Sequence, residues 1–362
     1  MEKIEELNGL CRSGKNGKFS LFDSTINPGE RASLGLPLPE LLGYAPLYLP
    51  VKVFQGKSPG PTALFFATMR GDEFNGMEIL KQVGELSLLE QLRGTLLIVP
   101  VLNVYGLLNR SRFLPDGREL DHAFPGTGEG TYTERMARLF TDSLFDRCDF
   151  CVEICSGSLN HDLLPHLFTD CGVPGNRDLA AEFPVSVVVD IEPEEGSLHR
   201  VARETGKPML TYSAGEAMRF DRRAIRLGKR GLLRLLRRVG MLPTEDRPGV
   251  EPRQEPLFSE ASLWVHATKS GIAHPKVRLG DRVRKGDTLA VVAEPFGSVQ
   301  EVQVAAPGEG VVVGANDLPL VFEGEPLFRL ARFSEPKEAA DKVQEWASAG
   351  IDPDPADEPA AE

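Results

Sequence analysis

The sequence predicts an α/β fold, a three-layer mixed sheet with helices on both faces, followed by a small C-terminal β domain. Over residues 46–245, short apolar, β-rich runs alternate with segments of helical spacing. Each run is apolar on both of its faces, which is typical of a sheet that helices cover on both sides. Beyond the Pro-rich "RPGVEPRQEP" the pattern changes to short strands and tight turns, so we expect a second domain over 256–332.

The elements of the first domain follow one another regularly along the chain. Strands are expected over 45–56, 62–69, 94–103, 148–155, 185–190 and 208–213. Helices are expected over 75–92, 133–147, 199–206 and 223–242. The flanking segments have no such periodicity. We expect residues 1–45 to form an irregular lead, and residues 333–362 to form one helix and a disordered acidic tail.

The second domain has a turn pattern of its own. The segment "VRLGDRVRKGDTLAVVAEPFG" resembles the paired turns of barrel-sandwich domains, such as lipoyl carriers. A carrier would need a lysine on its exposed hairpin, and "PFGSVQEVQVAAPGEG" has none. We therefore expect a lid or an assembly module, and one hypothesis is an assembly protein that acts mainly through this domain.

Composition narrows the class of protein. Of the 362 residues, 41% are hydrophobic and 26% charged, as in soluble globular proteins. No run of about 18 apolar residues is present, and the first residues lack an apolar signal core, so we expect a cytoplasmic protein that binds no membrane. Five cysteines suit a reducing compartment, and a net charge of -12 argues against nucleic-acid binding.

Polar side chains follow the ends of several expected strands. Arg70 and Glu73 come after the second strand, and the segment 103–122 after the third. Cys155 and Ser213 end two further strands. Because ligands of α/β sheets bind beyond the carboxyl ends of the strands, we expect these residues to share one site.

The loop "RGDEFNG" has the layout of half a zinc site except at its first residue. Catalytic zinc takes three protein ligands and keeps one position open for water. A His-x-x-Glu pair on a strand-to-helix loop can supply two of the three ligands. Arg70 stands where that histidine would be, three residues before Glu73.

Four motifs resemble, in the same order, the succinylglutamate desuccinylase/aspartoacylase family, a branch of the zinc carboxypeptidase-like hydrolases. They are "RGDEFNGMEI", "VPVLNVYGLLNRSRFLPDGRELDHAFPG", "TYSAGEAMRFD" and "LGDRVRKGDTL…EPFG", and lie between about residues 28 and 331. The subgroup associated with ATP-grasp glutamate ligases has the most similar pattern. The resemblance implies a zinc carboxypeptidase-like fold and hydrolysis of N-acyl amino acids or glutamyl peptides with zinc.

The metal positions of the family are changed in this chain. Glu73 matches one zinc ligand. Arg70 and Cys155 stand where the resemblance places two histidine ligands. A guanidinium has no lone pair to donate and stays protonated, so Arg70 cannot bind zinc. It can instead pair with Glu73, and we expect this fixed organic cation to replace the metal.

The catalytic and substrate positions are also changed. Arg112 matches the arginine that stabilises an oxyanion in the family, but Ser213 stands where the resemblance places the general-base glutamate. Asp121 and His122 stand where an Asn-Arg pair binds the substrate carboxylate. A serine hydroxyl cannot take a proton from water at neutral pH as a carboxylate can, and Glu216 is expected to be structural.

Cys155 leaves two alternatives open. It could join Glu73 and His122 in a non-standard metal site, because thiolate is a good zinc ligand. It could also act as a nucleophile with His122 as its base. Cys148, Cys151 and Cys155 are not expected to hold an iron–sulfur cluster, because the last two would lie about 13 Å apart along a strand at about 3.3 Å per residue.

The main hypothesis is a pseudoenzyme in which the Arg70–Glu73 pair replaces the metal, with no cofactor. Arg70, Arg112, Asp121 and His122 would bind a small carboxylate-bearing ligand or glutamyl peptide, and the protein could regulate an active homologue or an ATP-grasp ligase. The alternative is a hydrolase of N-acyl amino acids or glutamyl peptides, with zinc or the Cys155 nucleophile. His161 and His166 are expected to be surface or hydrogen-bonded histidines outside the chemistry.

Overall fold

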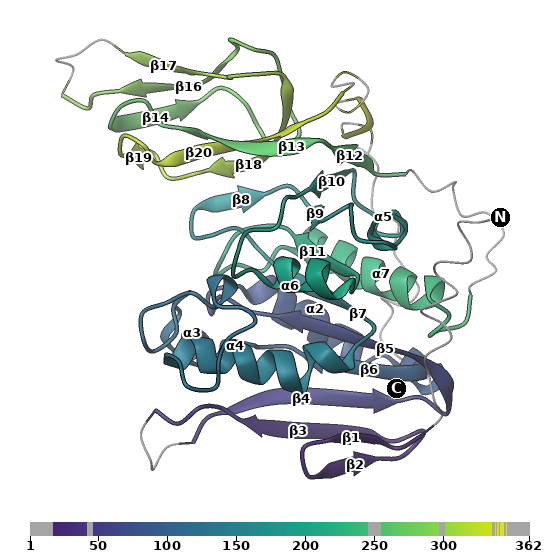
Figure 1. The fold of residues 1–362 in the computed structure, drawn as a ribbon. Coiled ribbons are helices and arrows are strands. Elements are labelled where there is room, and N and C mark those ends of the chain that lie inside the picture. The colour runs from purple at the N-terminus through teal and green to yellow at the C-terminus, as the bar shows by residue number, and fades with distance from the viewer. Residues whose placement is uncertain are drawn as a thin grey trace, which may run out of the picture.

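The computed structural model describes residues 17–41, 46–244, 255–296 and 301–334, with a few helical positions between 337 and 345. A nine-stranded mixed sheet lies between helical layers, and two smaller sheets lie at the C-terminal end of the molecule (Figure 1). The predicted combination of a three-layer α/β domain and a small β domain is confirmed.

The central sheet is parallel in its middle and has antiparallel pairings on both sides of that block. In spatial order its strands are β12 (Leu257–Ser259), β10 (Val187–Asp190), β9 (His166–Thr169), β11 (Met209–Ser213), β7 (Phe150–Cys155), β5 (Ser58–Ala67), β6 (Arg93–Val99), β4 (Tyr48–Gln55) and β3 (Arg31–Pro37). Strands β11, β7, β5 and β6 run parallel, whereas β4 and β3 are antiparallel additions. The carboxyl ends of four neighbouring strands therefore meet at one edge.

Helices cover both faces because the strands are apolar on both sides. They are α2 (Phe74–Gly84), α3 (Val104–Asn109), α4 (Tyr132–Ser143), α5 (Asn176–Ala180), α6 (Leu198–Thr205) and α7 (Arg222–Arg238), with short 3₁₀ turns η1 (Ser87–Gln91), η2 (Leu120–His122) and η3 (Phe145–Arg147). Phe65 belongs to a core cluster with α2 and α7, and its neighbour Phe66 to a second cluster with α4 and α6. Among the described helices, none combines the length and the apolar character that a bilayer crossing requires.

The C-terminal β domain has its own core between two small sheets. One contains β13 (Ala261–His266), β20 (Pro326–Arg332), β18 (Gly310–Asn316) and β15 (Arg282–Val283), and the other contains β17 (Val302–Ala305), β16 (Thr288–Ala293), β14 (Gly271–Pro275) and β19 (Leu320–Val321). Strand β8 (His161–Leu163), which lies between β7 and β9 in the sequence, pairs with β18. The pairing of β8 with β18 thus joins the first domain to the β domain.

Two predicted boundaries are wrong. The expected irregular lead contains β1 (Phe19–Leu21), β2 (Ser24–Ile26) and the sheet edge β3. Apolar and polar residues alternate too weakly along these partly exposed strands for the sequence to reveal them. Strand β12, which was expected in the β domain, completes the other edge of the central sheet. The expected linker and acidic tail lie largely outside the described residues, and the described positions within 337–345 are helical, as expected.

Candidate functional site

A cavity of about 490 Å³ lies beyond the carboxyl ends of the central strands, and we call it the strand-end cavity. The predicted site residues that line it are Arg70, Arg112, Asp121, His122, Cys155 and Ser213. Asn103 is different, because it is fully buried and its Oδ1 accepts the Gly106 N–H at 2.7 Å to cap α3. Most of the residues expected to share a site at the strand ends therefore line one cavity, whereas Asn103 and Glu73 are buried and do not line it.

Local backbone geometry brings Arg70 to the cavity and the buried Glu73 within hydrogen-bond distance of its guanidinium. Strand β5 ends at Ala67, and Thr68 then adopts the left-handed φ of 55°. The Thr68 hydroxyl donates a hydrogen bond of 2.9 Å to the Glu73 carbonyl, which closes the loop before α2. Gly71 packs against the backbone of Gly106, so close that any Cβ would lie 1.9 Å from the Gly106 carbonyl carbon.

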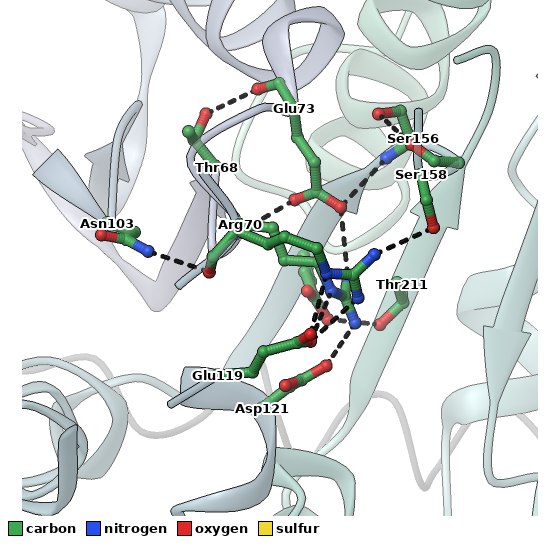
Figure 2. A network of polar contacts seen from close by, with 12 residues as sticks. Thr68, Arg70, Glu73, Asn103, Glu119, Asp121, Ser156, Ser158 and Thr211 are labelled. Atoms are coloured by element: carbon green, nitrogen blue, oxygen red, sulfur yellow. Dashed lines mark hydrogen bonds and ion pairs between the residues drawn. The ribbon is translucent and has the colours of Figure 1, made fainter. Parts of the chain in front are cut away.

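The Arg70 guanidinium lies among three carboxylates (Figure 2). Its Nη1 is 3.0 Å from Glu73 Oε1, its Nη2 donates to Asp121, and its Nε is 3.7 Å from Glu119. Although burial disfavours the charged form, Glu73 and Asp121 raise the pKa of Arg70 well above its ordinary value. Arg70 is therefore a permanent cation whose charge is balanced within the protein.

Glu73 is buried, with 1% of its surface exposed. Besides the guanidinium, its carboxylate accepts the Arg70 N–H at 3.3 Å and the Ser156 N–H at 3.5 Å. Burial raises the pKa of Glu73 to about 7, and Arg70 opposes that rise. Both carboxylate oxygens are thus engaged by groups of the protein itself.

Arg112 is held by a bidentate ion pair. Its Nε and Nη2 donate to the two Glu119 carboxylate oxygens at 2.8 and 2.9 Å, and its Nη1 donates to Ser158 Oγ at 2.9 Å. The paired Glu119 raises the pKa of Arg112, against the opposing effect of burial. The expected oxyanion-stabilising arginine is therefore present at the cavity, with its charge compensated by a neighbouring carboxylate.

Cys155 is a buried thiol at the end of β7. It is 7% exposed and forms a hydrogen bond with Ser213, its register partner on β11. Burial, together with Glu73 and Glu153, raises the pKa of Cys155 well above its ordinary value. The thiol therefore stays protonated at neutral pH, which makes it a poor nucleophile.

His122 does not approach Cys155 as an activating base. Its side chain is 63% exposed, and its Nε2 lies 3.7 Å from Asp121 Oδ1. Cys155 instead contacts Ser213. In the described structure, the proposed thiol–imidazole pair is therefore not assembled, and that part of the alternative hypothesis has no geometric support.

The remaining predicted residues have structural partners. Glu216 accepts the Asn160 N–H at 2.8 Å, which agrees with its expected structural role. His166 is fully buried, and its Nδ1 lies 2.5 Å from the Leu164 carbonyl oxygen. His161 stands edge-on to Trp264 of the β domain at 5.9 Å and lines the strand-end cavity. Its Nδ1 lies 3.1 Å from the Leu159 carbonyl oxygen, so it is a hydrogen-bonded histidine as expected, and pairing of β8 with β18 brings it to the cavity wall.

The donors at the family's metal positions do not fit zinc. Arg70 has no lone pair, Cys155 is protonated and bonded to Ser213, and Glu73 is engaged by Arg70. The potential ligand atoms of Glu119, Asp121 and His122 lie within 4.8 Å of one another. Glu119 and Asp121, however, already serve as the carboxylate partners of Arg112 and Arg70.

Among the cavity residues that sequence reasoning did not single out, three bear directly on the charge of the site. Glu119 is the common partner of both predicted arginines, and lies two residues before Asp121. Glu153 interrupts the apolar strand β7, two residues before Cys155, and this charge in a buried strand was a readable signal. Arg329 reaches the cavity from the distant strand β20, which no local pattern could reveal.

The three neighbouring cysteines lie in different surroundings. Cys148 and Cys151 are buried in the core cluster that packs against α4, whereas Cys155 lines the strand-end cavity. This division agrees with the expectation that they hold no shared cluster.

Comparisons with known proteins agree with this architecture. Residues 59–239, half of the chain, match the model of the succinylglutamate desuccinylase/aspartoacylase catalytic domain. A curated relative, the N-alpha-acetyl-L-2,4-diaminobutyric acid deacetylase of Halomonas elongata, is 26% identical over 298 residues, which cover 79% of this chain and 86% of the relative.

Two solved structures superpose over nearly their full length. The product-bound ectoine utilization protein EutE (DoeB) of Ruegeria pomeroyi has a TM-score of 0.76 and 25% identity, covering 88% of this chain and 99% of that one. A succinylglutamate desuccinylase/aspartoacylase of Rhodobacter sphaeroides has a TM-score of 0.74 and 19% identity, covering 84% and 96%. With the matched catalytic domain and this fold, the chain belongs to the succinylglutamate desuccinylase/aspartoacylase family.

Proposed function

We propose that this protein is a non-hydrolytic member of its family that binds a small carboxylate-bearing amino-acid derivative or glutamyl peptide in the strand-end cavity. The observation that carries the proposal is the ion pair between Arg70 and the fully buried Glu73. A guanidinium beside the one retained ligand position supplies the positive charge of a metal without its Lewis acidity or its open position for water.

The rest of the cavity supports the same proposal. Ser213 stands at the general-base position and is engaged with the Cys155 thiol, so neither group can deprotonate a water molecule at neutral pH. Both retained functional residues, Glu73 and Arg112, are held by partners of opposite charge. The cavity is thus preserved as a binding site while the groups for hydrolysis are replaced.

Metal content and turnover test this proposal on one protein sample. The chain is expressed with added zinc, purified without chelator and analysed for metal, then incubated with N-acetyl-L-glutamate and N-acetyl-L-aspartate. We expect far less than about one zinc per chain and no release of acetate above background. Stoichiometric zinc that is lost in Glu73→Gln or Cys155→Ala would contradict the proposal.

A gain-of-metal variant provides a positive control for the same assay. Arg70→His with Cys155→His restores the residue types that the family carries at these two positions. We expect this double variant to retain zinc where the wild type does not. If it also fails to bind zinc, the surrounding loops have changed as well, and metal loss would not depend on Arg70 alone.

The similarity to a deacetylase favours a second candidate, hydrolysis of N-acyl amino acids. The curated relative is named for deacetylation of an N-acetylated diamino acid, and it aligns with most of this chain. Under this hypothesis the acidic groups near His122 would rearrange to bind a metal. Zinc-dependent acetate release that survives in Cys155→Ala but is lost in His122→Gln would support this candidate and exclude the first.

A further inference from the structure

The strand-end cavity contains one arginine that differs from the other two. Arg329, on β20 of the C-terminal domain, lines the cavity together with Arg70 and Arg112. Both of the latter are paired with carboxylates. Within the described part of the chain, no carboxylate oxygen lies within ion-pair distance of the Arg329 guanidinium.

Aromatic rings and one hydroxyl hold this guanidinium in place. Its central carbon lies 4.3 Å from the ring centre of Phe168 on β9 and 5.7 Å from that of Trp264 on β13. Its Nε and Nη2 donate to Ser262 Oγ at 3.2 and 3.0 Å. A guanidinium has five N–H donors. Within the described residues, the two on Nη1 and the second one on Nη2 form no hydrogen bond, so they can donate to a ligand.

The electrostatic surroundings of Arg329 differ from those of Arg112. Burial lowers the pKa of Arg329 to about 10, and among the described residues no carboxylate opposes this effect as Glu119 does at Arg112. A partly buried guanidinium without a counter-ion is costly, so an anionic ligand would be bound strongly there.

We propose that Arg329 is the anion-binding residue of the strand-end cavity and binds the carboxylate of the ligand through its Nη1–Nη2 edge. This inference rests on the proposed function, since it names the group that recognises the ligand. It also replaces our sequence-based assignment of that role to Arg70 and Arg112, whose charges are already balanced.

The balance of charge in the cavity favours a singly charged carboxylate. Its lining includes six acidic residues (Asp72, Glu119, Asp121, Glu153, Glu192 and Glu194) against three arginines. A doubly charged phosphate would be repelled by this surplus, whereas a carboxylate on an N-acyl amino acid adds one charge beside Arg329. A planar carboxylate also matches the guanidinium edge in a bidentate arrangement.

Trp264 provides a direct probe of binding. The sequence has two tryptophans, so a Trp346→Phe background leaves Trp264 as the only one. N-Acetyl-L-glutamine, N-acetyl-L-alanine and the uncharged N-acetyl-L-alaninamide are titrated against this protein while its fluorescence is recorded. We expect saturable changes with the two carboxylates and none with the amide.

Three variants test the role of the guanidinium. Arg329→Gln is expected to weaken binding of N-acetyl-L-alanine about 10- to 100-fold, and Arg329→Lys by less, because the charge remains but the planar fork is lost. Arg282→Gln is the matched control, since Arg282 lies in the same β domain but pairs with Glu309 outside the cavity. Equal affinity of wild type and Arg329→Gln, or equal affinity for amide and carboxylate, would overturn the inference.

The two proposals fail in different ways. If Arg329→Gln does not fold, the comparison of N-acetyl-L-alanine with its amide on the parent protein decides the inference alone. A parent protein that binds neither carboxylate also overturns it. Stoichiometric zinc or acetate release, combined with carboxylate binding that depends on Arg329, would overturn the non-hydrolytic function and leave the inference in place.

Discussion

At the scale of single residues, Arg70 and Glu73 form a buried ion pair at the site. The guanidinium is partly shielded, with 24% of the side chain exposed, and the carboxylate is almost completely buried. Removing one partner of such a pair leaves an uncompensated buried charge, which costs more than the pair itself contributes. The pair is therefore expected to stabilise this fold, whether or not it stands in for a metal as proposed above.

Arg70→Met should lower the free energy of unfolding by about 3 kcal/mol, because Glu73 loses its counter-ion. Without Arg70 the pKa of Glu73 rises above its present value of about 7, whereas the unfolded glutamate titrates near 4.5. The folded state then holds a proton that the unfolded state has lost, so stability falls as pH rises. Urea unfolding should show a larger deficit at about pH 8.5 than at about pH 6.

Two further variants control this prediction. Arg70→Met with Glu73→Gln should recover part of the loss, because no formal charge remains at position 73. Arg138→Met removes the exposed pair with Asp142 and should change stability by less than about 0.5 kcal/mol. A pH-independent deficit in Arg70→Met would show that Glu73 does not carry the effect.

His166 should make the free energy of unfolding decrease at acidic pH. Burial lowers its pKa to about 3 from a reference value of 6.5. Between these values the unfolded state binds a proton that the folded state does not, so stability falls as pH decreases, by up to about 1.4 kcal/mol per pH unit.

The variant His166→Gln should therefore show a shallower fall of unfolding free energy between about pH 6 and pH 4. His274→Gln, at an exposed position on β14, should keep the wild-type slope. Parallel curves for His166→Gln and wild type would contradict the assignment of the acid sensitivity to this imidazole.

At the scale of secondary-structure elements, the site depends on loops that follow β5, β6, β7 and β11. The loop after β5 reaches the cavity only because Gly71 lies against the backbone at Gly106, in α3. Direct contact between the backbone at Gly71 and the backbone of α3 thus positions the loop. This contact leaves no room for a side chain at position 71.

Gly71→Ala should destabilise the protein by about 1–3 kcal/mol, because its methyl group would overlap the Gly106 carbonyl carbon. Gly128→Ala is the matched control: a Cβ there meets open space, so its stability should be unchanged or slightly higher. Thermal unfolding of both variants would measure the difference. Equal melting temperatures would mean that the loop can move away from α3 at little cost.

At the scale of the whole molecule, the β domain completes both the sheet and the site. Val187 and Val189 of the central sheet share a core cluster with Val311, Val313 and Ala331 of the β domain. Trp264 and Arg329 form part of the cavity wall, and β8 pairs with β18. This arrangement argues against a β domain that acts only as an independent assembly module.

A chain ending at residue 248 should aggregate or unfold at a lower temperature than the full chain, because it exposes this apolar surface. Co-expression with residues 249–362 as a separate chain should restore a soluble complex in which both pieces co-elute on size exclusion. A monomeric 1–248 fragment that unfolds at the wild-type temperature would show that the interface is not required.

The sequence by itself determined the three-layer class, because apolar runs such as Phe65–Phe66 require cover on both faces of a sheet. It also determined that Arg70 cannot bind a metal, since this follows from the chemistry of a guanidinium. The meeting of Arg70, Cys155 and Ser213 was predictable too, because parallel strands end at a common edge.

Only the tertiary structure decided how those residues are partnered. Glu119 compensates both predicted arginines, and His122 lies beside Asp121 away from Cys155; neither follows from spacing along the chain. Arg329 enters from a strand more than a hundred residues away, through pairing of β8 with β18. Contacts between distant segments depend on the packing of whole domains, which local periodicity and motif spacing do not encode.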